Sequence, residues 1–80
     1  MVSVVNDTNT MYKVAVSVPD GSVGDSTPCT MPPGSEEGWM RMGTVLVSVF
    51  DMADDLVASI SVDSPPIGNV TVKLSKLGLK

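Results

Sequence analysis

Six side chains in the middle of this chain have types that suit ligand binding. They are one aromatic and five acidic residues: Trp39, Glu36, Glu37, Asp51, Asp54 and Asp55. An indole ring presents a large apolar face with one hydrogen-bond donor, and carboxylates accept hydrogen bonds from hydroxyl groups. The sequence therefore predicts a ligand-binding site, suited to a carbohydrate or an aromatic group, built from these residues. The alternative is that the tryptophan closes the end of a thin core and the carboxylates are solvated.

Catalysis and metal binding have little support in the composition. The chain contains no histidine, the commonest general base, and Cys29 has no activating partner beside it in the sequence. A lone thiol cannot form a structural zinc site, and the acidic residues lack the spacing of an EF-hand loop. Acidic loop residues are usually solvated, so we keep an acid-pair hydrolase only as a remote hypothesis. We expect no enzyme, no cofactor and no metal site.

The charge balance excludes some classes of partner. Nine acidic and five basic residues give a net charge of −4, whereas nucleic acids and anionic membrane surfaces reward a basic face. No apolar run reaches the length of a membrane span, so we expect no membrane insertion. No leader peptide is visible after Met1. The sequence predicts a cytoplasmic protein or one exported without a leader, although removal of a leader would give the same sequence.

The size of the chain points to self-association. Eighty residues make one domain, residues 1–80, with a thin core. A single cysteine allows no internal disulfide, and small domains without disulfides or metals often gain stability from a partner subunit. We therefore expect a homo-oligomer, most simply a dimer.

The strongest structural pattern lies in residues 38–51. Val45, Val47 and Val49 alternate with polar and apolar residues that include Leu46 and Phe50. Strict alternation of β-branched and aromatic residues is typical of a half-buried strand. In a sandwich only one face of a strand meets the core, so Leu46 and Phe50 should lie on the outer face.

Shorter strand patterns surround this central strand. Residues 2–5, 11–18, 29–31, 56–62 and 70–74 read as extended segments, separated by turn residues. Between residues 20 and 38 the composition is typical of a long loop that contains the short strand at 29–31. The sequence predicts an all-β protein: a small antiparallel β-sandwich, immunoglobulin-like (Ig-like) or Greek-key, with about six or seven short strands and no substantial helix.

Two resemblances accompany this pattern. Asn6-Asp7-Thr8, then the apolar strand 14–18, then Met31-Pro32-Pro33-Gly34 are similar in order to the β-domain of the von Hippel–Lindau family, a small β-sandwich that binds peptides. The histidine of that family's peptide site has no counterpart here, so its specificity is not implied. In composition the chain also resembles small leaderless mushroom lectins and defence proteins, which are acidic, rich in valine, serine and threonine, and independent of disulfides.

These observations lead to two functional hypotheses. The first is a non-enzymatic binding module, a lectin-like or defence-type sandwich that acts as an oligomer. The alternative is a structural or adaptor subunit that recognises protein through a sheet edge or an apolar sheet face.

Leu77 and Leu79 are out of phase with Val70, Val72 and Leu74. Either an irregularity near residues 75–76 resets their register, or they join an exposed apolar surface. On the second reading, the predicted oligomer interface consists of Leu46, Phe50, Leu77 and Leu79.

Overall fold

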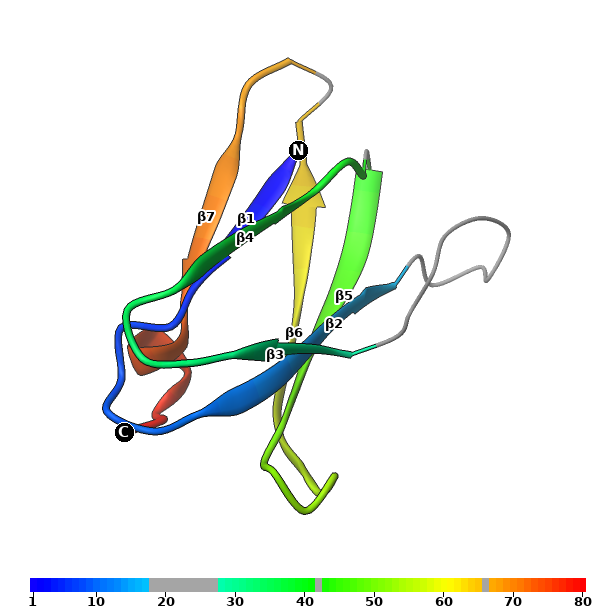
Figure 1. The fold of residues 1–80 in the computed structure, drawn as a ribbon. Coiled ribbons are helices and arrows are strands. Elements are labelled where there is room, and N and C mark those ends of the chain that lie inside the picture. The colour runs from blue at the N-terminus through cyan, green and yellow to red at the C-terminus, as the bar shows by residue number, and fades with distance from the viewer. Residues whose placement is uncertain (18–27, 42, 66) are drawn as a thin grey trace.

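A computed structural model of the protein describes residues 1–17, 28–41, 43–65 and 67–80. In these residues two sheets pack face to face, which confirms the predicted β-sandwich (Figure 1). The strands, in chain order, are β1 (Val2–Val5), β2 (Tyr12–Ser17), β3 (Cys29–Met31), β4 (Glu36–Trp39), β5 (Gly43–Phe50), β6 (Leu56–Ser64) and β7 (Val70–Lys73). One sheet has the order β4-β1-β7 and the other the order β3-β2-β5-β6.

The described strand pairings are antiparallel, as predicted, except that β1 and β7 run parallel. The two strands begin at the same end of the molecule (Figure 1), where the amino group of Met1 donates hydrogen bonds of 3.4 Å to the carbonyls of Pro65 and Gly68. The chain leaves β6 at this end and crosses to the other sheet. Because β7 therefore starts at the same end as β1, it runs beside β1 in the same direction.

The core is filled mainly by valine, as the alternation predicts. The side chains of Val45, Val47 and Val49 of β5 are fully buried. On the adjacent strand β2, Val14 pairs with Val49 and Val16 pairs with Val47. The inward side chains of both sheets form one cluster of buried residues: Val2, Val4, Tyr12, Val14, Val16, Met31, Val45, Val47, Val49, Val72 and Leu74. Burying a valine side chain stabilises a fold by roughly 1.5–3 kcal/mol, so this cluster is the main source of stability.

The predicted loop before residue 38 contains a strand that the sequence did not indicate. The short strand at 29–31 is confirmed, but Glu36–Trp39 also forms a strand, β4, which pairs with β1. Between them the turn at Pro33 and Gly34, with Gly34 at φ 83°, carries the chain from one sheet to the other. Residues 20–27 of the predicted loop lie outside the described residues.

A register shift changes the inward face of β6. By alternation, Leu56, Ala58, Ile60 and Val62 should share the inward face. The last three pack against the core, whereas Leu56 is 59% exposed. The β5–β6 ladder is irregular between Val49 and Phe50. Because side chains alternate with period two, the irregularity reverses the direction of Leu56.

The C-terminal segment shows why Leu77 and Leu79 are out of phase with the strand before them. A short 3₁₀ helix, η1 (Leu74–Leu77), follows β7 and ends at Gly78, which has φ 84°. The helical turn interrupts the two-residue alternation of β7, so Leu77 and Leu79 both pack against the core. No helix that the structure describes is long enough to cross a membrane.

Candidate functional site

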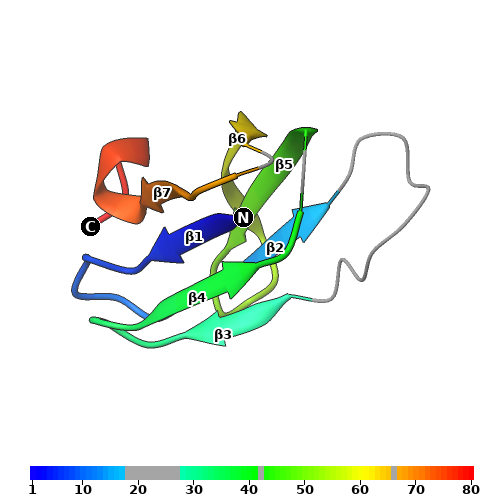
Figure 2. The same cartoon turned by 90° about the horizontal axis from the view of Figure 1, so that it is seen from above.

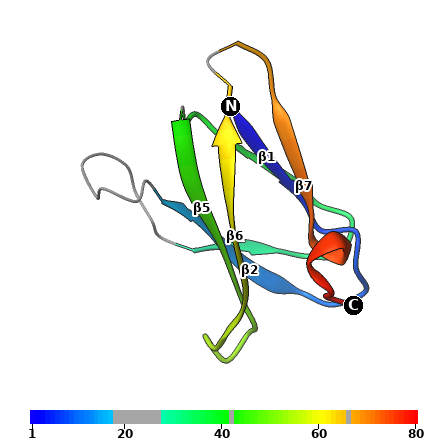
Figure 3. The same ribbon diagram turned by 180° about the vertical axis from the view of Figure 1, so that it is seen from behind.

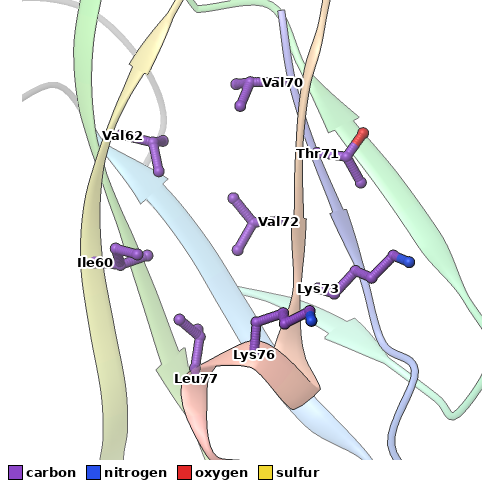
Figure 4. A pocket seen from close by; sticks show the side chains of 8 residues that line it. All are labelled: Ile60, Val62, Val70, Thr71, Val72, Lys73, Lys76 and Leu77. Atoms are coloured by element: carbon purple, nitrogen blue, oxygen red, sulfur yellow. The ribbon is translucent and has the colours of Figure 1, made fainter.

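One side of the sandwich is open. The turn from β3 to β4 joins the two sheets on one side, while β6 and β7 are the outer strands on the other (Figure 2). No strand in the described part of the chain pairs with the outer edge of either. A groove of about 410 Å³ lies between them. It is lined by Ile60, Val62, Val70, Thr71, Val72, Lys73, Lys76 and Leu77 (Figure 4).

The floor and walls of this groove are apolar. Ile60 and Val62 point from β6 toward Val70 and Val72 of β7, and Leu77 rises from η1 at one end (Figure 4). Four of the five remain partly exposed although they pack against the core; Val72 is buried. The groove is thus a continuation of the core to the surface, and its volume falls within the range of about 300–1,000 Å³ typical of ligand sites.

The edge of β7 beside the groove offers backbone hydrogen bonds. The N–H of Val70 donates to the carbonyl of Met1, at 3.1 Å, so the backbone groups of Val70 face β1. Along a strand, successive residues direct these groups to opposite edges. Thr71 therefore directs its N–H and C=O toward the open side, where none of the described residues pairs with them. Thr71 is exposed, so an added strand has access to both groups.

Positive charge gathers at the η1 end of the groove. Lys73 and Lys76 line it, and with Lys80 they account for three of the five basic residues in the chain. Neither Lys73 nor Lys76 forms an ion pair with a residue that the structure describes. The ion pair among the described residues joins Lys13 of β2 to Asp54, which lies in the turn between β5 and β6. Both lysines are exposed.

The residues predicted to bind a ligand do not form one site. Trp39 lies at the end of β4 beside Val2 and packs against the core, partly buried. Glu36 and Glu37 are exposed further back on the same strand. The acidic loop after Phe50 lies at the other end of β5, whose eight residues span about 26 Å (Figure 3).

The acidic loop has structural roles of its own. One carboxylate oxygen of Asp51 accepts hydrogen bonds from the N–H groups of Ala53 and Asp55, at 2.9 and 3.0 Å. Asp54 has a positive φ of 67° and pairs with Lys13 at 2.7 Å. These contacts close the turn between β5 and β6. The described residues contain no group of three or more histidine, cysteine or acidic side chains that could hold a metal ion.

The four leucine and phenylalanine residues predicted to form an interface also separate. Leu46 and Phe50 lie on the outer face of the four-stranded sheet, opposite the buried valines of β5, as expected. Leu77 and Leu79 pack against the core instead, and Leu77 also lines the groove. The first pair remains a candidate contact surface.

The alternation in residues 56–62 and 70–74 is consistent with inward faces for Ile60, Val62, Val70 and Val72, but it does not reveal the groove between them. The alternation of each strand shows which side chains face inward. It does not show which strands become neighbours, because strand order depends on the crossings between sheets. No local sequence signal would have identified this site.

Comparison of the chain with protein-family models, curated proteins and solved structures finds no match. The two resemblances described for the sequence receive no support from these comparisons.

Proposed function

We propose that the protein is a non-enzymatic protein-recognition module that binds an extended segment of another protein in the groove between β6 and β7. The observation that carries this proposal is an apolar groove bordered by a strand edge with available backbone groups. Of the two hypotheses from the sequence, it corresponds to recognition through a sheet edge. The lectin-like hypothesis relied on residues that lie at separate places in the fold.

Strand addition explains how such a groove would bind. An extended segment beside β7 would exchange backbone hydrogen bonds with Thr71, and its alternate side chains would enter the space between Ile60, Val62 and Val72. Backbone bonds provide affinity for any extended segment, and the groove selects those with apolar side chains at every second position. A peptide of sequence Ser-Val-Ser-Val-Ser-Val is therefore a suitable probe.

The backbone part of the proposal is tested with Thr71→Pro. Proline removes the N–H that faces the groove but leaves the bonds of β7 to β1, and prolines are tolerated on edge strands. Thr71→Ala is the control, because it keeps the N–H. In an NMR titration the probe should shift amide signals of β6 and β7 in the wild type and in Thr71→Ala. Binding by Thr71→Pro should weaken by a few-fold to about tenfold, the value of one hydrogen bond.

The side-chain part is tested by filling the groove. Val62 points into it (Figure 4). The neighbouring Ser61 is exposed, and alternation along the strand puts its side chain on the outer face. Val62→Trp should abolish binding of the probe, and Ser61→Trp should leave it unchanged. Circular dichroism melts establish that each variant is folded. Equal binding by both tryptophan variants, or the absence of any shift with the wild type, would overturn the proposed function.

A further inference from the structure

We infer that the segment bound in this groove carries acidic side chains at the end that lies against η1, next to its alternating apolar residues. This inference rests on the proposed function and specifies its partner. The occupant is an extended protein segment whose valine-like side chains fill the groove and whose carboxylates meet Lys76.

The charge at the groove has the opposite sign to the charge of the whole chain. The protein has a net charge of −4, yet the lining of the groove includes two lysines and no acidic residue. Both lysines come from the segment that forms the end of β7 and η1, but the Lys73 side chain extends from β7 away from Ile60 and Val62 (Figure 4). The positive charge at this end of the groove is therefore that of Lys76. The other end of the lining is formed by Val62 and Val70, and no charged side chain lines it; the amino group of Met1 lies beyond that end, bonded to the carbonyls of Pro65 and Gly68. The groove therefore distinguishes the two ends of a bound segment.

A carboxylate of the protein itself lies near these lysines but is already occupied. Asp7 accepts hydrogen bonds from the N–H and the hydroxyl of Ser75, at 2.9 and 2.6 Å. It does not form an ion pair with Lys73 or Lys76. Besides the hydrogen bonds from Ser75, the charge of Lys73 helps to lower the pKa of Asp7, so this charge already acts within the protein. The ammonium group of Lys76 remains available to a partner, and complementary charge gives binding specificity and faster association.

The location of the lysines also predicts how the preference responds to salt. Lys73 and Lys76 are exposed, and interactions between exposed charges are strongly screened as ionic strength rises. The apolar contacts and backbone bonds are much less sensitive to salt. A preference for acidic segments should therefore decline with added salt, while binding of the uncharged probe persists.

Six peptides test the inference. Two arrangements, Asp-Asp-Val-Ser-Val-Ser-Val and Val-Ser-Val-Ser-Val-Asp-Asp, present the acidic end in either chain direction, and each is compared with versions that carry asparagine or lysine in place of aspartate. Affinities come from NMR titration at low salt and at about 0.5 M salt. In one direction the aspartate peptide should bind several-fold to about tenfold more tightly than the asparagine peptide, and the lysine peptide should bind most weakly.

Charge reversal of the protein provides the matched comparison. Lys76→Glu should invert the order of the aspartate and lysine peptides, whereas Lys80→Glu makes the same change of charge at a residue outside the groove lining and should preserve it. Lys76→Gln, a milder change, should remove the preference without inverting it. Melting curves establish that the variants are folded.

The outcomes separate the inference from the proposed function. Equal affinities for aspartate, asparagine and lysine peptides in both directions would overturn the acidic preference and leave strand recognition standing. The same holds if Lys76→Glu and Lys80→Glu alter the preference equally, since the effect would then come from net charge. Absence of binding by every peptide, including the uncharged probe, would overturn both.

Discussion

Asn6 is a completely buried polar residue that uses both ends of its side-chain amide. Its Nδ2 donates to the carbonyls of Thr10 and Met31, at 2.9 and 2.8 Å, and its Oδ1 accepts from the N–H and hydroxyl of Thr8. The backbone of Asn6 also bonds with Gly34 and Ser35. One residue therefore joins the β1–β2 connection to the turn by which the chain changes sheets.

We expect Asn6→Ala to lower the free energy of unfolding by about 2–4 kcal/mol, because it leaves several buried groups without partners. Asn9 is exposed in the same connection, so Asn9→Ala should change stability by less than about 0.5 kcal/mol. Urea denaturation of both variants gives the comparison. Equal stabilities would show that water or a local rearrangement replaces the bonds of Asn6.

Asp7 predicts a specific dependence of stability on pH. Hydrogen bonds from the Ser75 hydroxyl and N–H lower the pKa of its carboxyl below the usual value of 3.8. Because the folded pKa lies below the unfolded one, the contribution is complete above the unfolded pKa and disappears as pH falls through the folded pKa. The melting temperature of the wild type should exceed that of Asp7→Asn at pH 6, and the difference should close as pH falls below about 3.9. A difference that is unchanged at pH 2 would contradict this assignment.

At the scale of elements, β4 is stabilised by its pairing with β1 and by one aromatic residue, and not by the intrinsic strand propensity of its residues. Two glutamates and a glycine make up most of this strand, and all three are exposed. Trp39 supplies its apolar contact, because it packs partly buried against the core. This placement favours the interpretation of Trp39 as the closure of the core over its role as a ligand platform.

Trp39→Ala should accordingly destabilise the protein by about 2–4 kcal/mol, somewhat less than the loss of a fully buried tryptophan. Trp39→Phe should restore most of the stability, since it keeps an aromatic ring in the same place. Chemical denaturation measures both. A Trp39→Ala variant as stable as the wild type would remove Trp39 from the core and revive the predicted ligand site.

The elements that could be predicted are those whose side chains alternate by burial. Val14 and Val16, and the three valines of β5, identify their strands because the same residues form the core. The strand β4 and the helix η1 could not be predicted in this way. Both depend on contacts distant in sequence: β4 pairs with β1, and Ser75 of η1 bonds to Asp7.

For the molecule as a whole, the order of the strands decides what is exposed. The alternation of β6 and β7 places their valines and isoleucine inward, but only the crossing between sheets makes these strands the two borders of an open side. The groove and its charged end are therefore properties of the assembled fold. The outer face of β5 follows more directly from the sequence, and Leu46 and Phe50 lie there as predicted.

This outer face remains the candidate surface for self-association. Phe50 has Leu56 as its neighbour on β6, and Leu56 is 59% exposed, so the apolar surface extends across two strands. A contiguous apolar patch on a small domain often marks an interface. We expect a two-fold dimer through this face, since that symmetry is the commonest. Leu77 and Leu79 are no longer part of the expected interface, because they pack against the core.

Two variants separate the interface from the core. Leu46→Ser combined with Phe50→Ser should give a folded single chain, because both side chains lie on the outer face. Leu77→Ser should preserve the dimer but lower the free energy of unfolding by about 1–3 kcal/mol, because it removes apolar contacts with the core. Sedimentation velocity at micromolar concentration measures the mass, and urea denaturation measures the stability. A wild-type mass equal to one chain would rule out the dimer, and the outer face of β5 would then be an apolar surface that this small protein leaves in contact with water.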